Sequence, residues 1–432
     1  MSSNNAPIQV TGWTEERLID LCEFINRGKA PQYVIQSSVK AIGQRCVREK
    51  FQGNEARFQD QKKIEGHLFA KKGDVLLNST GTGTIGRSCV FDEDMAYIVD
   101  GHVTVVRPYQ QKCSSSLLNS LLKTSQYQRY FEIYCYTGST NQIELSSAAV
   151  AGVKLWLPSR NEQQAIAIIL DTMDEAIRQT EAVLHKLRQV KAGMLHDLLT
   201  RGLDENGELR DPIRHPEQFK ASPVGWIPKE WDVQAFEVVC LKIQDGTHFS
   251  PASTSGPCLY ITSKNIRLGY MDLTCVGRII QKEHDEIYRR CDVRKGDVLL
   301  TKDGANTGNA AINEIEEQFS LLSSVALLRC DEIKLHNQFL LQTLLSPMFQ
   351  RNIQDSMSGN AITRLTLRKI NNFQIALPHY EEQLCISKCL NSHQEKLAVE
   401  ERNCEKLKIA KQGLMHDLLT GTVRVPQHLI GG

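Results

Sequence analysis

The sequence predicts an α/β (α+β) protein in which a globular domain followed by a long helix occurs twice. The segments 157–200 and 377–420 align at a constant offset of 220 residues without a gap, and about 17 of their 44 positions are identical. The globular segments before them share the pattern Lys-Gly-Asp-Val-Leu-Leu at 72–77 and 295–300. An internal repeat of this kind indicates one structural unit used twice.

Each repeated segment is expected to form one long helix. Pro158 and Pro378 lie just before the helices, and no proline follows within either segment. Two heptad series run through the first copy, and eight of their ten residues are apolar: Ile166, Met173, Thr180, Leu187 and Met194, and Leu170, Ile177, Leu184, Lys191 and Leu198. The second copy keeps this frame but carries His393 and Glu400 in it. Five heptads predict a coiled coil, and we expect the two seams to pack on each other.

The globular segments are expected to begin with a turn and a strand at the shared Gly-Asp pattern, because an apolar run follows it. A Gly/Thr/Asn loop, a strand at 102–106 or 324–328 and a helical stretch at 117–133 or 338–354 come next. The predicted partition is therefore a first domain, a helix, a linker poor in core-forming residues, a second domain, a second helix and a tail. Their bounds are 1–156, 157–202, 203–223, 224–376, 377–422 and 423–432.

Composition limits the kinds of function that the chain can have. No apolar run is long enough to span a membrane, and the N-terminus does not resemble a secretory signal. Thirteen cysteines without a Cys-x-x-Cys pair indicate a reducing cytoplasm. The net charge is +1; residues 1–156 hold 18 basic and 15 acidic residues (net +3), and residues 222–378 hold 17 of each (net 0). DNA binding would therefore depend on local clusters or on a partner.

Three motifs have both a structural and a functional interpretation. Cys385, Cys389 and His393 follow one another at four-residue spacing, but the first copy has Ala165, Ile169 and Met173 there, which favours a buried helix face over a metal site. His-Asp pairs end both helices, where we expect structural or docking surfaces and no hydrolase.

The third motif is the glycine loop at 81–86, which fits GxGxxG and nearly fits a phosphate-binding loop. A strand is expected at 87–91, and the matching loop at 302–308 keeps neither pattern. We therefore favour a polar loop that touches DNA over a nucleotide site, and a plain hairpin turn stays open. Motifs of methyltransferases and nucleases are not evident.

Two similar domains on a stiff rod can place two binding surfaces on DNA, whose grooves repeat about every 34–36 Å. Because the two domains differ in their loops, the expected target is bipartite and asymmetric, with an unread spacer.

The chain resembles the specificity subunits of type I restriction-modification enzymes. The motifs that carry the resemblance are LPxxxEQ, the heptad helix, KxGxxHDLLT, GDVLL and the passage from Arg210-Asp211-Pro212 to Trp231. The first domain departs from it by opening with Thr-Gly-Trp-Thr-Glu at 11–15.

The resemblance implies two target-recognition domains separated by two antiparallel helices, with the chain ends brought together in a pseudo-twofold ring. It also implies double-stranded DNA, two methyltransferase subunits and motor-nuclease subunits as partners, in a bacterial or archaeal cytoplasm. S-adenosylmethionine, ATP and Mg²⁺ would then bind to the partner subunits, and this chain would be non-catalytic. Residues at the helix ends are candidates for partner docking: Glu162, Gln163, His196, Asp197, Glu382, Gln383, His416 and Asp417.

Candidates for DNA contact are polar or basic residues of the loops, because such side chains suit base edges and phosphates. In the first domain they are Arg27, Lys29, Gln44, Arg45, Thr82, Thr84, Arg87, Thr140 and Asn141. In the second domain they are Thr247, His248, Lys264, Asn265, Lys302, Asn306, Asn360 and Arg364. Two other functions remain open: a coiled-coil scaffold whose domains bind proteins, and a nucleotide-dependent enzyme that uses the glycine loop.

Overall fold

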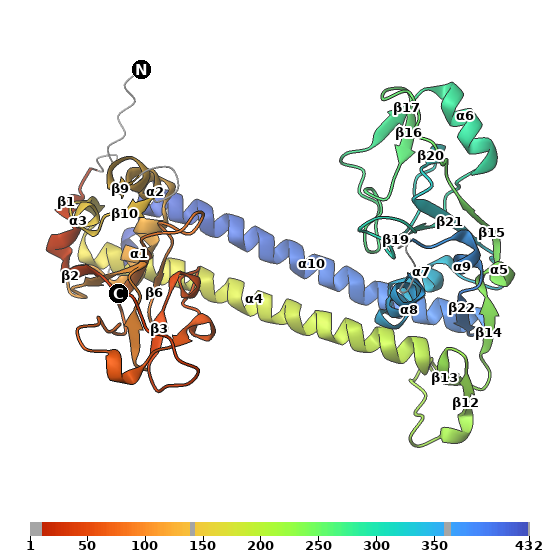
Figure 1. The fold of residues 1–432 in the computed structure, drawn as a ribbon, viewed down its shortest axis with the longest axis horizontal. Coiled ribbons are helices and arrows are strands. Elements are labelled where there is room, and N and C mark those ends of the chain that lie inside the picture. Colours follow the sequence, from red (N-terminus) through yellow and green to blue (C-terminus); the bar gives the residue numbers. More distant parts are fainter. Residues whose placement is uncertain (1–10, 139–142, 358–363, 431–432) are drawn as a thin grey trace. The chain divides into compact units, whose positions relative to one another are not determined.

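The computed structural model describes residues 11–138, 143–357 and 364–430 (Figure 1). Two compact units divide the chain: Met1–Glu181 with Arg402–Gly432, and Ala182–Glu401. The division falls inside the two long helices, so each unit contains one globular domain and part of each helix. We call these globular parts the first and the second domain.

The first domain is built on two small sheets. A four-stranded antiparallel sheet has the order β2-β8-β5-β6, and a three-stranded sheet has the order β4-β3-β7 with β3 and β7 parallel. The strands of these sheets are β2 (Cys22–Arg27), β3 (Lys40–Ile42), β4 (Arg57–Phe58), β5 (Val75–Asn78), β6 (Ser88–Val90), β7 (Tyr97–Val99) and β8 (Val103–Pro108). Two short pairs join β1 (Thr14–Arg17) to β11 (Lys154–Leu157), and β9 (Tyr136–Thr137) to β10 (Glu144–Leu145). The helices are α1 (Ser115–Lys123), α2 (Ser125–Tyr130) and α3 (Ser147–Ala151).

The second domain repeats this topology. Its sheets have the orders β15-β21-β18-β19 and β17-β16-β20, and a pair joins β14 to β22. The strands are β14 (Asp232–Ala235), β15 (Cys240–Asp245), β16 (Cys258–Ile261), β17 (Gly277–Ile279), β18 (Val298–Thr301), β19 (Ala310–Ile312), β20 (Phe319–Leu321), β21 (Val325–Cys330) and β22 (Gln374–Leu377). The helices are α5 (Phe236–Val239), α6 (Gln281–Arg290), α7 (Asn337–Leu345), α8 (Pro347–Met357) and α9 (Leu367–Asn371). The predicted internal repeat is thus confirmed.

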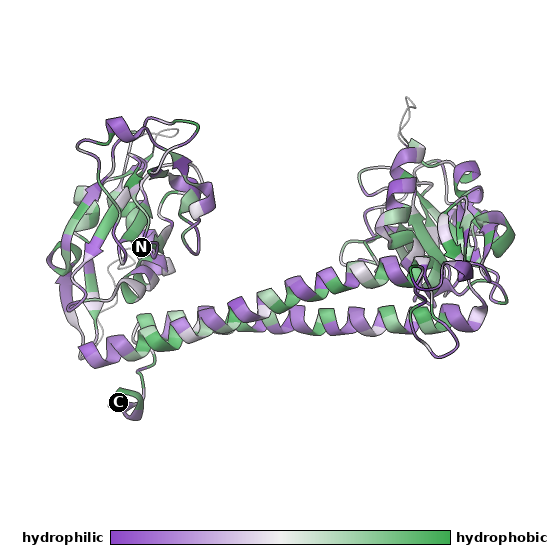
Figure 2. Ribbon diagram, turned by 90° about the horizontal axis from the view of Figure 1, so that it is seen from below, coloured by the Kyte–Doolittle hydropathy of each residue, from purple (hydrophilic) through white to green (hydrophobic). Residues whose placement is uncertain are grey.

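The shared Val-Leu-Leu pattern forms the central strand β5 or β18 because both faces of the sheet are covered. Side chains of a strand alternate between faces. Val75 and Leu77 join one apolar cluster and Leu76 another, and all three are fully buried. Val298 and Leu300 are divided from Leu299 in the same way. Figure 2 shows the hydrophobic residues concentrated on the inner strands of each domain.

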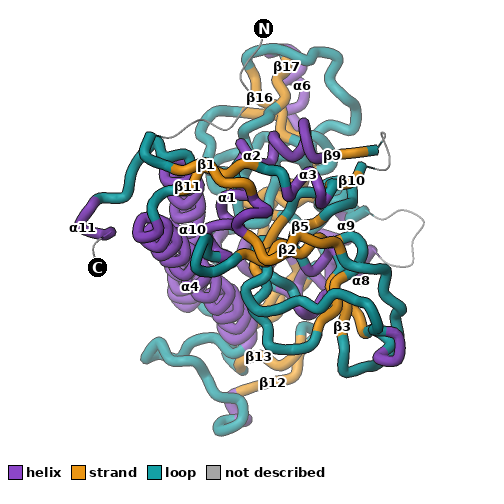
Figure 3. Tube along the Cα trace, turned by 90° about the vertical axis from the view of Figure 1, so that its left-hand side faces the viewer, coloured by secondary structure: helices purple, strands orange, loops and turns teal. Residues whose placement is uncertain are grey.

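The long helices α4 (Arg160–Thr200) and α10 (Tyr380–Leu419) follow β11 and β22 directly. Figure 3 draws both helices in purple. All ten seam positions predicted in α4 are buried or half-buried, which confirms the heptad prediction. Within the first unit, Asp174 pairs with Lys411 at 2.8 Å and Glu181 with Lys408 at 2.7 Å, so the helices run antiparallel.

The same antiparallel register holds within the second unit. Arg188 pairs with Glu401 at 2.8 Å, and the ammonium group of Lys191 donates to Gln394 Oε1. Lys191 lies in the seam, and its burial lowers the pKa of its ammonium group. In the described residues no helix is long and apolar enough to cross a membrane.

Two expectations about local structure were wrong. The segment 203–223, predicted to be a linker poor in core-forming residues, buries Leu203 and Phe219 and forms the strand β12 (Phe219–Ser222), which pairs with β13 (Gly225–Pro228). Cys385 and Cys389 are exposed, so they do not form a buried helix face. Among the described residues, no group of three His, Cys, Asp or Glu side chains is placed to hold a metal ion.

Candidate nucleic-acid interface

Each domain has an equivalent loop at its edge. The loop lies between β5 and β6 in the first domain and between β18 and β19 in the second. Each loop is closed by a backbone hydrogen bond, from Gly86 N to Asn78 O or from Gly308 N to Thr301 O, both 2.9 Å. Gly81, Gly86, Gly304 and Gly308 all have a positive φ, which only glycine adopts at little cost. The sequence chemistry of the turns therefore produces the same loop twice.

A glutamine braces each loop from the helix side. Gln128 Nε2 donates to Gly86 O at 2.9 Å, and Gln350 Nε2 donates to Gly308 O at 2.8 Å. Both glutamines also donate to the C-terminal end of the preceding helix. The two loops are thus fixed to their domains by matching contacts.

The glycine motif at 81–86 is a connection between antiparallel strands. Strand β6 follows it and pairs with β5, where a nucleotide-binding motif would have a helix. The hydroxyl of Thr84 donates within the loop, to Thr80 O at 3.1 Å or to Gly81 O at 3.2 Å. The expectation of a strand after the motif is confirmed, and the nucleotide-site alternative loses its structural basis.

The first domain has a polar cavity of about 450 Å³ beside this loop. Its lining comes from β3 and the segments on both sides of it, from β4 and the turn before it, and from the turn before β8. The lining residues are Tyr33, Ala41, Gly43, Gln44, Arg45, Asn54, Glu55, Ala56, Arg57, Asp100 and His102. Gln44 and Arg45, predicted from the sequence, therefore lie together with Arg57 and His102, which were not.

Hydrogen bonds order the wall of this cavity. Gln44 Nε2 donates to Thr80 Oγ1 at 2.6 Å, and Thr80 Oγ1 lies 2.8 Å from His102 Nδ1. The guanidinium of Arg57 stacks over the ring of Tyr33 at 3.7 Å. Burial, and then the neighbouring carboxylate of Asp100, raises the pKa of Tyr33 to about 12, so its hydroxyl stays a donor. The cavity thus combines cations with fixed donors and acceptors, as base edges or phosphates require.

The other predicted residues of the first domain differ in whether their side chains are free to contact DNA. Lys29, Thr82 and Arg87 are exposed. Arg27 is held by an ion pair with Glu144 at 2.7 Å and by the carbonyl of Gly101. The hydrogen bond from Arg27 is the main cause that lowers the pKa of Glu144. Thr140 and Asn141 lie outside the described residues.

In the second domain, a buried carboxylate gathers basic side chains. Asp245, at the end of β15, is 2% exposed. Its Oδ2 lies 3.2 Å from Lys302 Nζ and 3.4 Å from His248 Nε2, and its Oδ1 lies 3.4 Å from Arg290 Nη2. His248 and Arg290 remain more than half exposed. Lys302 is only 6% exposed, so its prediction as a DNA contact was wrong.

Two more predictions in this domain were wrong because the side chains are used inside the fold. Asn265 is buried; its amide donates to Asp272 O and Cys275 O, and its Oδ1 accepts from Thr262 N. Thr247 is buried and bonds to the backbone of Phe249.

The other predicted residues of the second domain remain candidates. His248, Lys264 and Arg364 are exposed. Asn306 is half-buried and donates to Ser263 O at 3.3 Å. Asn360 lies outside the described residues.

Four of the residues predicted to dock partners instead hold the helix ends to their own unit. Glu162 is 1% exposed and accepts two hydrogen bonds from Arg424, at 2.7 and 2.6 Å. Glu382 accepts from Arg210 at 2.6 Å, from Trp231 Nε1 at 3.1 Å and from Leu203 N at 2.8 Å. We call these two arrangements the carboxylate latches.

The neighbouring glutamines act in the same way. Gln163 donates to Pro158 O at 3.1 Å, and Gln383 donates to Lys334 O at 2.8 Å. Both glutamines are buried, and the two glutamates are held in the carboxylate latches. The prediction that Glu162, Gln163, Glu382 and Gln383 dock partners was therefore wrong. The imidazoles of His196 and His416 are exposed, while Asp197 and Asp417 are partly buried.

Four residues of the two candidate sites were not predicted from the sequence: Arg57, His102, Asp245 and Arg290. None of them lies in a motif, although His102 is the first residue of the strand expected at 102–106. Asp245 is the last residue of β15, and its three basic neighbours were not predicted either. Those neighbours come from positions 3 to 57 residues further along the chain, so only the folded domain brings them together.

The comparisons with known proteins agree with this architecture. The family model of the type I restriction modification DNA specificity domain matches residues 11–189 and 259–408. The two matches cover most of both domains and parts of both long helices. This chain belongs to that family, whose model matches it in two segments.

The type I restriction enzyme MjaVIII specificity subunit of Methanocaldococcus jannaschii is 28% identical over 280 residues, which are 63% of this chain and 63% of that subunit. The EcoBI specificity subunit of Escherichia coli is 25% identical over 338 residues, 72% of this chain and 69% of that subunit. The crystal structure of the S subunit from M. genitalium has the same fold, with a TM-score of 0.57 at 16% identity and coverage of 97% of this chain and 98% of that chain.

Proposed function

We propose that this chain selects the DNA sequence for a type I restriction-modification enzyme and carries out no chemistry itself. Each domain would read one half of a bipartite, asymmetric target in double-stranded DNA. The observation that carries the proposal is a repeated framework with different polar side chains at the same edge. Arg45, Arg57 and His102 line this edge in the first domain, and His248 and Arg290 lie at it in the second. Different donors and cations on one framework suit two different half-sites.

Exchange of the first domain tests this proposal. Residues 1–156 would be replaced by the equivalent domain of a relative, and the methylated motif of cells that express the complete system would be sequenced. One half of the motif should change and the other should stay, because the domains are separate units. Exchange of residues 224–376 is the matched control and should change the opposite half. A change in both halves after a single exchange would contradict the proposal.

The long helices would dock the two methyltransferase subunits. Several apolar side chains point outward from them although the seam is already filled. These are Ile168, Val183, Val190, Val399 and Ile409, which are 44–66% exposed. Exposed apolar side chains in heptad spacing, such as Val183 and Val190, suit a partner helix. His196 and His416, with Asp197 and Asp417, would contribute polar contacts at the helix ends.

Two substitutions on one helix separate docking from folding. Val190→Glu should weaken co-purification with the methyltransferase subunit while the chain stays folded, because Val190 is 44% exposed. Leu184→Glu should disrupt the seam itself, because Leu184 is 5% exposed and an unpaired buried carboxylate costs several kcal/mol. Normal co-purification of the Val190→Glu chain would count against docking on this face.

S-adenosylmethionine, ATP and Mg²⁺ would bind to the methyltransferase and motor-nuclease subunits, in a bacterial or archaeal cytoplasm. The hairpin geometry of residues 81–86 supports this division, because it does not place a helix N-terminus at the loop. Equilibrium dialysis of the isolated chain against ATP and S-adenosylmethionine checks the proposal. Micromolar binding of either ligand, lost when Thr82 or Thr84 is changed to Ala, would contradict it.

A further inference from the structure

Helix α6 distinguishes the second domain from the first. It occupies residues Gln281–Arg290, between β17 and β18. The equivalent stretch of the first domain, between β4 and β5, contains only the short 3₁₀ turn Gln61–Lys63 among the described residues. Helix α6 ends with Arg290, whose guanidinium lies 3.4 Å from the buried carboxylate of Asp245. The element that this domain does not share therefore delivers a cation to the edge that we propose contacts DNA.

Asp245 already has a buried counter-ion. Lys302 lies 3.2 Å from it and its side chain is 8% exposed. A carboxylate and an ammonium group buried together satisfy each other's charge. Arg290 is thus not needed to neutralise Asp245, and its side chain remains 57% exposed. The cluster has a surplus positive charge, and that charge faces solvent.

The contact with Asp245 restricts the orientation of Arg290. A carboxylate that holds one amino group of a guanidinium leaves the other donors free and aimed in one direction. An arginine in a fixed orientation can donate two parallel hydrogen bonds, and among base edges the O6 and N7 atoms of guanine match that geometry. A phosphate contact needs mainly charge, which a freely moving lysine would supply equally well.

The net charge of the domain also favours base reading over phosphate binding. Residues 222–378 contain 17 basic and 17 acidic residues, so their net charge is 0. Many phosphate contacts would require an excess of basic residues. A domain without that excess gains more sequence discrimination from a few cations in fixed positions.

We propose that Arg290, positioned by Asp245, reads a guanine in the half-site bound by the second domain. This inference rests on the proposed function of the chain, because it assumes that the second domain binds one half-site.

The experiment uses the complete enzyme with its methyltransferase subunits. Arg290→Ala and, as a matched control, Arg289→Ala would be expressed, and the methylated motif sequenced. Arg289 is an exposed arginine on the same helix. Arg290→Ala should relax one guanine position in the second half-site, with discrimination reduced roughly 5- to 150-fold, while Arg289→Ala leaves the motif unchanged. Arg290→Lys should also relax that position, because lysine lacks the planar fork.

Three outcomes would overturn the inference. An unchanged motif with weaker methylation at all sites, restored by Arg290→Lys, would assign Arg290 to a phosphate. Equal behaviour of the Arg290→Ala and Arg289→Ala enzymes would remove Arg290 from the interface. A lower melting temperature of the Arg290→Ala enzyme with an unchanged motif would assign a structural role.

Failure of the proposed function is distinguishable from these results. If the chain does not select the sequence, replacement of the whole segment 224–376 also leaves the motif unchanged. If only the inference on Arg290 fails, that replacement still changes one half-site.

Discussion

The two domains use one framework, but they fill two equivalent places in it with different chemistry. The last residue of the first long strand is Arg27 in β2 and Asp245 in β15. Arg27 pairs with Glu144, whereas Asp245 gathers Lys302, His248 and Arg290. This place lies at the edge of the domain. The difference shows that the framework tolerates a reversal of charge at this place, because each charge has partners of the opposite sign.

The second place lies inside the framework, around an ion pair that both domains share. Arg107 binds Asp74 at 2.6 Å, and Arg329 binds Asp297 at 2.9 Å. In the first domain, Arg107 also stacks over Phe24 and donates to Phe69 O.

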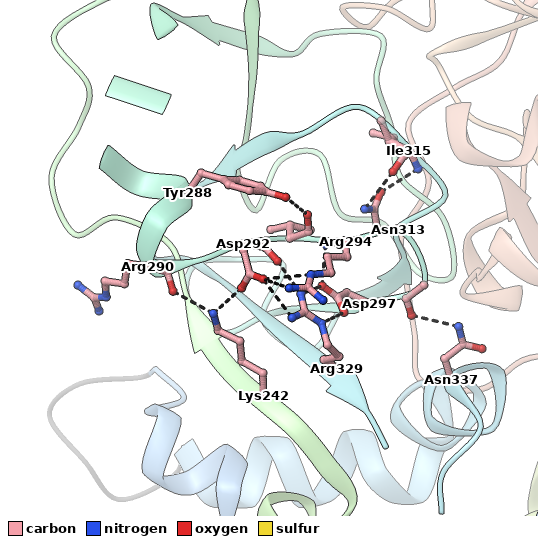
Figure 4. A network of polar contacts seen from close by, with 12 residues as sticks. Lys242, Tyr288, Arg290, Asp292, Arg294, Asp297, Asn313, Ile315, Arg329 and Asn337 are labelled. Carbon is pink, nitrogen blue, oxygen red and sulfur yellow. Dashed lines mark hydrogen bonds and ion pairs between the residues drawn. The ribbon is translucent and has the colours of Figure 1, made fainter. Parts of the chain in front are cut away.

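In the second domain, charged residues surround the same pair. Lys242 binds Asp292 at 2.5 Å, and Asp292 also binds Arg329 at 3.2 Å (Figure 4). The same arginine is therefore supported by an aromatic ring in one domain and by a second carboxylate in the other. The same substitution made at equivalent positions of the two domains should therefore have effects of different size.

The largest effect is expected when the shared carboxylate is removed. Asp74→Asn leaves Arg107 buried without a counter-ion and should destabilise the first domain by about 3–5 kcal/mol. Asp297→Asn should cost less, because Arg329 keeps the carboxylate of Asp292. Hydrogen exchange of the amides in β5 and β18 measures the two domains separately. Asp94→Asn is the control, since its side chain is 85% exposed. Equal losses in both domains would contradict the compensating role of Asp292.

The carboxylate latches should also differ, but in the opposite sense and by less, because the larger loss is expected in the second unit. Glu382→Gln weakens contacts with three donors, whereas Glu162→Gln weakens contacts with Arg424 alone. Each change should cost about 1.5–3 kcal/mol, and more at Glu382, because hydrogen bonds to a charged group are lost. The readout is amide exchange in the first turns of α4 and α10. Faster exchange in α4 of the Glu162→Gln chain than in α10 of the Glu382→Gln chain would reverse the predicted order.

A pair of equivalent glycines should behave alike, which tests the similarity of the two frameworks. A Cβ atom at Gly28 would lie 2.0 Å from Val99 O, and one at Gly246 would lie 1.9 Å from Leu321 O. Alanine at either position should therefore destabilise its domain by about 1–3 kcal/mol, since backbone must move. Gly193→Ala is the control: the added Cβ atom meets nothing within 4 Å, and because Gly193 lies inside α4, alanine should stabilise the helix by up to about 1 kcal/mol. Tolerance of alanine at only one of the two sites would show that the frameworks differ there.

The smallest effect concerns acid stability, which should be specific to the second domain. Burial alone would raise the pKa of Asp292, but the hydrogen bond from Lys242 and the charge of Arg329 outweigh it and hold that pKa well below its usual value of 3.8. A lowered pKa in the folded state contributes stability above the usual pKa, and this contribution is lost as the pH falls below it. Asp292→Asn should therefore make the stability measured at the amides of β18 depend less on pH in the acid range. Its effect on β5 should be absent, and an equal change in both strands would refute the assignment.

The repeat itself was predictable because it rests on patterns that are local in the sequence. The Gly-Asp turn and the apolar run of Val75, Leu76 and Leu77 predicted a strand, and the heptads of α4 predicted its seam. The turn glycines of both loops were likewise predictable, because backbone conformation at a positive φ selects glycine. Hydrophobic periodicity and turn chemistry need no knowledge of distant contacts, so the sequence alone determined the architecture and the family.

Only the tertiary structure decided which polar side chains are buried with partners and which stay exposed. Lys302 and Asn265 look like DNA contacts in the sequence but are buried with partners 57 and 3 to 10 residues away. Glu382 looks like a docking residue but binds Arg210, which is 172 residues away. A polar group can be buried only where the fold supplies its partners, and those partners have no fixed spacing in the sequence. Which loop residues are free to meet DNA therefore follows from the folded domains and not from the pattern of residue types.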